Sequence, residues 1–259
     1  MQLPTRYLVP AMVLSFIAAA TVNSQTTTWP RHEIEARGVL SIPSGDASFS
    51  SNGASGSVIS FSRDFDFQSE LGFELRYTHR TENGKHKLQA GYSRTTWDRE
   101  TMLSRSFSFR GETFEANLNA AGDLQLSNFR AMYAYRWGNE KLRIGPMGDI
   151  GVITTSLDID ASTNNQARSA SGSITKFAAT VGYDLDYDPT SRINIFNNLG
   201  GIVFMGERLF HAEAGMRVLV TRNFGFSGGY KFERYRVEDG PDFLRVTAHG
   251  PFFGGVFRF

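Results

Sequence analysis

The chain has 259 residues, with 27 Lys and Arg against 26 Asp and Glu, 22 Phe, 26 Gly and no Cys. The near-neutral charge argues against a basic face for nucleic acid, and the absence of Cys excludes disulfide bonds and thiol chemistry. The length is sufficient for one large domain, and no linker, repeat or second domain is evident.

The first 24 residues are predicted to be a secretory signal peptide. Arg6 is the only charge before residue 31, and the apolar run over residues 7–20 is too short for a transmembrane helix. Cleavage is expected after Ser24, with cleavage after Ala20 as the alternative. No Cys follows the cut, so a lipoprotein is excluded. Residues 25–31 are expected to form a short periplasmic segment ahead of a β-barrel over residues 32–259.

From residue 33 onward, apolar and polar residues alternate with a period of two, which is typical of β-strands with one apolar face. The Asn83-Gly84 pair lies between two such runs and is a strong hairpin signal. Ten strands are predicted, over residues 33–42, 71–78, 87–92, 129–137, 142–152, 176–187, 193–204, 211–220, 224–233 and 251–259.

The connections between these strands alternate between tight and long, as do the periplasmic turns and external loops of outer-membrane barrels. Segments 57–67 and 106–114 are either further strands or extensions of loops, so counts of eight or twelve stay open. Tight turns are predicted at 81–85, 138–141, 188–192 and 221–223, and long polar loops at 43–68, 98–122 and 161–172.

The apolar face distinguishes a membrane barrel from a soluble β-sandwich, whose strands also alternate. Its wide aromatic rings lie at strand ends, as expected of a girdle at a membrane interface. These rings are Tyr77, Tyr92, Trp137, Tyr187 and Phe259. The sequence therefore predicts an all-β fold, an antiparallel up-and-down transmembrane β-barrel of about ten strands.

The last nine residues resemble the C-terminal strand of Gram-negative outer-membrane barrels. Phe253, Phe257 and Phe259 share one face, and such a pattern is the signal read by the assembly machinery of that group, although Gly255 stands where a larger residue is common. With the signal peptide and the alternation over 32–259, the chain is similar to the OmpA/OmpW-like group of small outer-membrane β-barrel proteins. The resemblance implies an outer-membrane location, a monomeric state, and the barrel-assembly machinery, outer-membrane lipids and lipopolysaccharide as partners.

The charged face of the strands is expected to line a lumen only wide enough for its own side chains or a small solute. Acids and bases on this face are nearly balanced, which favours pairing across the lumen over a single-sign ring that selects ions. The predicted lumen network consists of Arg37, Glu74, Arg76, Arg130, Arg143, Asp149, Lys176, Asp184, Glu213, Arg217, Lys231 and Glu233.

No motif selects a specific activity. His211 and Glu213 share a strand face, so the imidazole is a weak candidate for a general base, with Ser227 on the next strand as nucleophile. No compact His-x-Ser motif like that of the lipid A deacylases is present, and no metal or cofactor is expected. The sequence therefore predicts a non-enzymatic barrel with a structural, surface-interaction or porin-like passive small-solute role. A lipid A acyl-modifying enzyme is the alternative.

Overall fold

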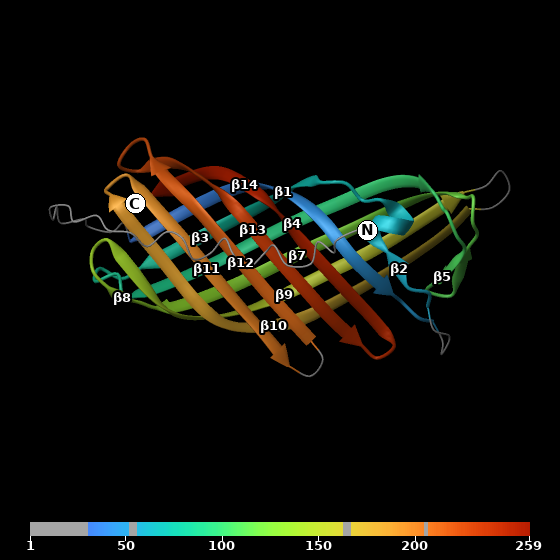
Figure 1. The fold of residues 1–259 in the computed structure, drawn as a ribbon. Coiled ribbons are helices and arrows are strands. Elements are labelled where there is room, and N and C mark those ends of the chain that lie inside the picture. The colour runs from blue at the N-terminus through green and yellow to red at the C-terminus, as the bar shows by residue number, and fades with distance from the viewer. Residues whose placement is uncertain (1–30, 52–55, 163–166, 205–206) are drawn as a thin grey trace, which may run out of the picture.

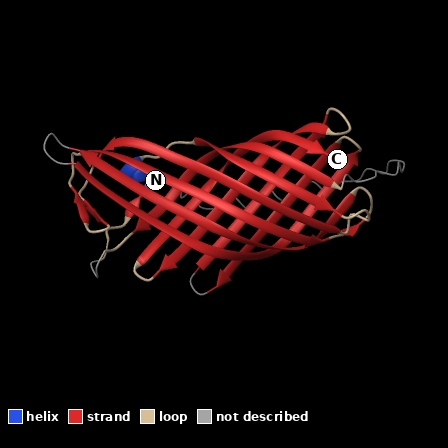
Figure 2. Ribbon diagram, turned by 180° about the vertical axis from the view of Figure 1, so that it is seen from behind, coloured by secondary structure: helices blue, strands red, loops and turns tan. Residues whose placement is uncertain are grey.

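The computed structural model describes residues 31–51, 56–162, 167–204 and 207–259. In this part of the chain, ten long antiparallel strands form a closed up-and-down barrel, which confirms the predicted fold class (Figures 1 and 2). The strands are β1 (His32–Ser48), β3 (Glu70–Arg80), β4 (His86–Met102), β7 (Asn119–Tyr135), β9 (Leu142–Ser162), β10 (Ala167–Thr190), β11 (Ile193–Phe204), β12 (Glu207–Leu219), β13 (Phe224–Asp239) and β14 (Asp242–Arg258).

Each long strand pairs with its sequence neighbours, and β1 pairs with β14 to close the ring. The predicted signal peptide over 1–24, its cleavage site and all but the last residue of the segment 25–31 lie outside the described residues. Within the described ranges, no helix is both long and apolar enough to cross a membrane.

Five short elements lie outside the ten-strand wall or extend it. β2 (Ile59–Ser60) pairs with β1 and leads into a π-helical turn, η2 (Phe61–Phe65), while β5 (Phe107–Phe109) and β6 (Glu112–Phe114) form a separate hairpin. β8 (Trp137–Gly138) pairs with β9 beyond the end of β7. Segments 57–67 and 106–114 therefore add no strand to the barrel ring, and the count of ten holds over eight or twelve.

The two ends of the barrel differ in their connections. One end, called here the turn end, holds the tight turns predicted from the sequence; in the first of them Gly84 has a φ of 61° and its N–H donates to the carbonyl of Thr81. The positive φ explains why glycine is suited to this position. His32 and Phe259 also lie at the turn end, where His32 N donates to Phe259 O at 3.1 Å. The opposite end is called the loop end.

At the loop end the wall is much taller on one side. β9 and β10 have 21 and 24 residues, against 12 and 13 for β11 and β12. The tall wall, formed by residues 94–102, 119–127, 154–162 and 167–175, extends beyond the β11–β14 side (Figure 1). The prediction of long loops was therefore wrong for residues 43–48, 98–102, 119–122, 161–162 and 167–172, which continue the barrel strands. Their buried inward side chains include Ala47, Ala120, Ala161 and Ala170, whereas their outward side chains include Asp98, Ser169 and Ser171.

The outward face of the barrel changes from apolar to polar at one row of paired residues. Tyr92, Phe129, Val152 and Phe177 stand abreast on β4, β7, β9 and β10, and all are exposed. The next outward row towards the loop end is Arg94, Ser127, Thr154 and Thr175. Because a lipid-facing surface must be apolar, this change marks the upper boundary of the apolar band on the tall side.

Candidate functional site

The interior nearest the turn end is filled by buried ion pairs, called here the turn-end charge layer. Lys87 Nζ donates to Asp184 Oδ1 at 2.7 Å, and Arg258 Nε donates to Glu33 Oε2 at 2.7 Å. Arg136 also donates to Asp186, with both side chains fully buried. Each charge has an opposite charge beside it, so the layer seals the interior without exposing an unpaired charge. The layer comprises Glu33, Glu35, Arg80, Lys87, Arg136, Asp184, Asp186, Arg217 and Arg258.

A second set of pairs, the central charge layer, lies above the first. Glu213 accepts from Arg37 Nη1 at 2.7 Å, and both of its oxygens accept from Arg76, at 2.9 and 2.7 Å. Lys231 Nζ donates to Glu74 at 3.0 Å, which continues the network around the barrel. These residues come from β1, β3, β12 and β13, so the layer joins several walls. It comprises Arg37, Glu74, Arg76, Arg130, Asp149, His211, Glu213, Lys231 and Glu233.

Two aromatic rings pack against the guanidinium groups of these layers. Phe196 and Phe252 point inward, and their ring centres are 6.2 Å apart. The guanidinium carbon of Arg37 lies 4.2 Å from the centre of the Phe252 ring, and that of Arg217 lies 3.9 Å from the centre of Phe196. The ring faces stabilise the cations where water is excluded.

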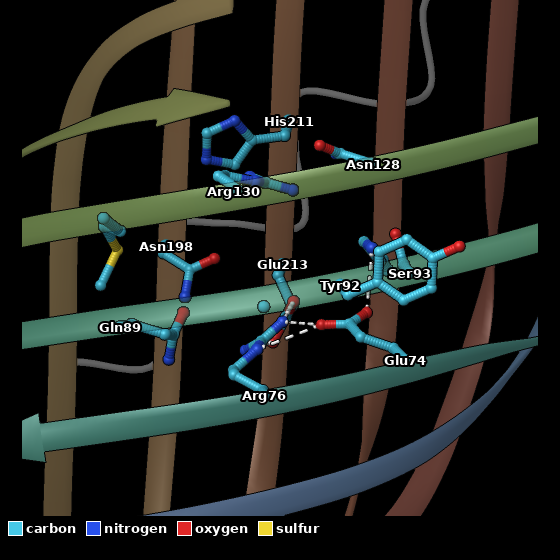
Figure 3. Close-up of a pocket in the computed structure, with 13 residues that line it drawn as sticks. Glu74, Arg76, Gln89, Tyr92, Ser93, Asn128, Arg130, Asn198, His211 and Glu213 are labelled. Carbon is cyan, nitrogen blue, oxygen red and sulfur yellow. Dashed lines mark hydrogen bonds and ion pairs between the residues drawn. The ribbon is translucent and has the colours of Figure 1, made fainter. Parts of the chain in front are cut away.

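The central layer contains small cavities, one of which lies beside β4. Its volume is about 40 Å³, and Gln89, Gly91 and Ser93 of β4 form one side of it. Their short or neutral side chains do not reach the charges opposite, so β4 leaves a gap beside Arg76 and Glu213 (Figure 3). A cavity of this size holds only a few water molecules, so it is not a ligand pocket of ordinary size.

The structure separates the weak catalytic candidates. Glu213 is bound by Arg37 and Arg76, whereas the carboxylate nearest to His211 is that of Asp149, with Nε2 and Oδ2 3.5 Å apart. In the β12–β13 register His211 is paired with Glu233 and Ser227 with Arg217, six residues away along each strand. His211 and Ser227 are therefore too far apart to act as base and nucleophile. Across the described ranges, no group of three or more His, Cys, Asp or Glu is placed to hold a metal ion.

The remaining predicted network residues take different places. Arg143 lies at the turn end and donates to the carbonyl of Asn83 at 2.5 Å, so it covers the mouth of the barrel and is only half-buried. Lys176 is also half-buried and lies in the row between the central layer and the loop end, opposite Ile153. The lumen network predicted from the sequence omits six buried charged residues that the structure places in the turn-end charge layer. The period-two pattern, extended to the ends of the strands, predicts an inward side chain for each of them. They are Glu33, Arg80, Lys87, Arg136, Asp186 and Arg258.

The loop-end half of the interior is apolar instead of charged, which corrects the expectation of a charged lumen throughout. Trp97 is fully buried, and its Nε1 donates to the carbonyl of Ser41 at 2.9 Å. Phe65 stacks on Phe67 with ring centres 5.4 Å apart. Inward apolar side chains of the tall wall complete this cluster. We call its Phe and Trp side chains the aromatic plug, which comprises Phe49, Phe61, Phe65, Phe67, Trp97, Phe107, Phe109 and Phe114.

Asp64 fixes the segment that carries three of these rings. Its carboxylate accepts from Arg105 Nε at 2.9 Å and Nη2 at 2.7 Å, and from the N–H of Ser60 at 2.7 Å. Burial alone would raise the pKa of Asp64, but the hydrogen bonds from Arg105, Arg63 and Ser60 outweigh it and lower the pKa to about 2. Asp64 is therefore ionised at neutral pH and ties η2 to the segment that leads into β5.

No protein-family model and no curated protein sequence matches this chain. Among solved structures, the outer membrane protease OmpT from Escherichia coli is similar, with a TM-score of 0.57, 9% identity, and coverage of 92% of this chain and 99% of that one. The translocator domain of the autotransporter NalP from Neisseria meningitidis has a TM-score of 0.50 and 8% identity, covering 88% of this chain and 89% of that one. At these identities the likeness concerns the fold alone. The chain therefore has the fold of outer-membrane β-barrels.

Proposed function

We propose that the protein is a sealed, non-enzymatic barrel of the Gram-negative outer membrane, with a structural or surface-interaction role. The observation that carries the proposal is the double closure of the interior, by two layers of buried ion pairs and by the aromatic plug. A passive route for ions and polar solutes needs a continuous polar path, and the plug interrupts it. This arrangement favours the structural and surface roles over the porin-like role.

The proposal places the turn end in the periplasm and the loop end outside the cell. Short periplasmic turns and longer outer segments are the usual arrangement of such barrels. Because the chain has no Cys, single cysteines can report on topology without background. Ser171→Cys on the tall wall should react with a membrane-impermeant maleimide in intact cells, whereas Asn139→Cys should react only after lysis. The reverse pattern would overturn the orientation.

The closed interior is tested by conductance. Purified barrels, shown to be folded by heat-modifiable migration on gels, should give no steady ionic current after insertion into planar bilayers. Liposomes that contain the protein should likewise not swell in isotonic sugar. A large, reproducible, ion-selective current from the unmodified protein would overturn the proposal that the interior is sealed, and would restore a channel role.

A further inference from the structure

Four arginines gather on the outer surface opposite the tall wall, and we call them the arginine patch. Arg208 on β12, Arg236 on β13 and Arg245 on β14 are paired residues in one row. Arg234 lies in the next outward row towards the turn end, between Phe210 and Thr247. Their neighbours on the same strands, Leu209, Tyr235 and Leu244, are buried, so the arginine side chains alternate to the outside.

The patch carries an uncompensated positive charge. Like charges that stand directly opposite one another on adjacent strands destabilise a sheet, and here three arginines stand abreast. Arg236 donates to Glu238 at 2.8 Å, and Arg245 donates to Asp46 at 3.3 Å. In the described part of the chain, neither Arg208 nor Arg234 has an acidic partner. The arrangement therefore has room for an anion that the protein itself does not supply.

An aromatic surface lies directly below the patch, on the side of the turn end. Phe232 and His249 are paired residues in the adjoining outward row, and Phe210 packs edge-on against Phe232 with ring centres 5.8 Å apart. Tyr230, next on β13, is half exposed, and its hydroxyl is 2.6 Å from His249 Nδ1. These rings belong to the apolar band, so the arginines stand at the height at which lipid chains give way to headgroups.

The tall wall differs where its own apolar band ends. There the first polar row contains a single arginine, Arg94, which donates to Gln125 at 2.7 Å. Higher up on that wall, Asp98, Asp123 and Asp158 stand abreast and would repel an anion. Of these two described walls, the one formed by β12, β13 and β14 is therefore suited to a negatively charged headgroup.

We propose that the arginine patch binds the phosphates of a phosphorylated glycolipid of the lipid A type in the outer leaflet, while Phe210, Phe232 and Tyr230 contact its acyl chains. Guanidinium groups suit this ligand because their planar donors bind phosphate oxygens in pairs. A free phosphate would use the arginines but gain nothing from the rings beneath them. The inference rests on the proposed outer-membrane location, with the loop end outward.

The test measures how much phosphorylated lipid A remains bound to the folded full-length protein. Three proteins are compared in nanodiscs of neutral phospholipid: the unmodified protein, the double variant Arg208→Ala/Arg234→Ala and the control Arg94→Ala. Each is titrated with lipid A or with its dephosphorylated form. Native mass spectrometry measures the bound lipid. The double variant removes both arginines that lack an internal partner, so its affinity should fall by roughly tenfold or more. Arg94→Ala should bind like the unmodified protein. Inorganic phosphate at millimolar concentration should not compete.

Three outcomes would overturn the inference. One is equal binding of phosphorylated and dephosphorylated lipid A, and another is an equal loss in the double variant and in Arg94→Ala. Full competition by inorganic phosphate would indicate a simple anion site without a role for the acyl chains. All variants are first checked for heat-modifiable migration, because only folded barrels are informative. The assay uses isolated protein, so it can fail while the topology and conductance experiments succeed, and the reverse also holds.

Discussion

Arg76 and Glu213 join distant walls of the barrel, since Nη1 and Nη2 of the arginine on β3 donate to the two carboxylate oxygens of the glutamate on β12 at 2.9 and 2.7 Å. Both side chains are buried. Geometry of this kind fixes the separation of the two walls as well as neutralising the charges. Its removal should affect the stability of the whole barrel.

Glu213→Gln is therefore expected to lower the free energy of unfolding by about 3–5 kcal/mol, because it leaves Arg37 and Arg76 buried without their shared counter-charge. Urea titration of the barrel in lipid vesicles, followed by tryptophan fluorescence, measures this difference. The matched control is Glu238→Gln, which removes the exposed partner of Arg236 and should cost less than about 1 kcal/mol. Equal losses in the two variants would contradict the role assigned to burial.

Val181→Arg tests the apolar band. Val181 is 69% exposed and lies midway along the outward face of β10, so an arginine there should cost about 2–4 kcal/mol. Val220→Arg, which places the same cation beyond the turn-end limit of β12, should cost only about 0–1 kcal/mol, because it lies near the interface. The same vesicle titration compares them, and a larger loss for Val220→Arg would contradict the assigned depth.

The pKa of Asp64, lowered to about 2, predicts how the plug responds to acid. A carboxyl whose pKa is lower in the folded than in the unfolded protein contributes stability above the unfolded value, near 3.9, and loses it as the pH falls through about 2. Amides 59–65 should therefore exchange faster between pH 4 and pH 2, after correction for the intrinsic pH dependence of exchange. Asp64→Asn should exchange faster already at pH 6 and respond less to acid. A plug whose exchange does not change in this range would contradict the prediction.

The aromatic plug and the charge layers should act as separate seals. Phe65→Ala removes a buried ring that stacks on Phe67, which should loosen the plug by about 3–5 kcal/mol. Hydrogen exchange should rise in residues 57–67 and 104–115, while amides in the turn-end half of the strands keep their protection. The charge layers remain, so the variant should still give no current. Phe177→Ala, on the lipid-facing side, is the control and should leave exchange in the plug unchanged.

The lipid-modifying alternative makes the opposite prediction for His211 and Ser227. In a non-enzymatic barrel, His211→Ala and Ser227→Ala leave the acylation pattern of lipid A unchanged when the protein is overexpressed, as read by mass spectrometry. An enzyme built on His211 would change the pattern on overexpression, and His211→Ala would abolish the change without reducing the amount of folded barrel. The first outcome is expected, because Arg37 and Arg76, not His211, bind Glu213.

The period-two pattern predicted the strands and their facing well because each wall residue has only two environments. Val181 and Phe257 are exposed on the outward face, while Glu213 and Arg217 are buried within, as their alternation indicated. The pattern contains no information on partners across the lumen, which depend on the stagger of the strands. The contact of Arg76 with Glu213 therefore could not be predicted from the sequence pattern.

The tall wall and the plug were missed for a different reason. Along β10, Ser169 and Ser171 face outward although they are polar, so the sequence pattern predicts a loop over 161–172. Above the apolar band the outward face meets water. Polar side chains therefore point outward and apolar side chains point inward there, while the period of two is kept. The recurring Phe residues at 61, 65 and 67 were visible in the sequence, although nothing in their spacing indicated that they fold back into the barrel.

The seam between β1 and β14 bears on how the barrel forms. Glu33 pairs with Arg258, and the ladder continues from there to Ser48 and Phe243, so this contact joins segments from opposite ends of the chain. Contacts between residues so far apart in the sequence form slowly, because the chain loses the entropy of closing a long loop before any of these contacts stabilises the fold. Until β14 arrives, β1 and β13 present unpaired edges that any other strand can join. Closure of this seam is therefore the expected slow step of folding, and the step at which a chain without β14 would aggregate.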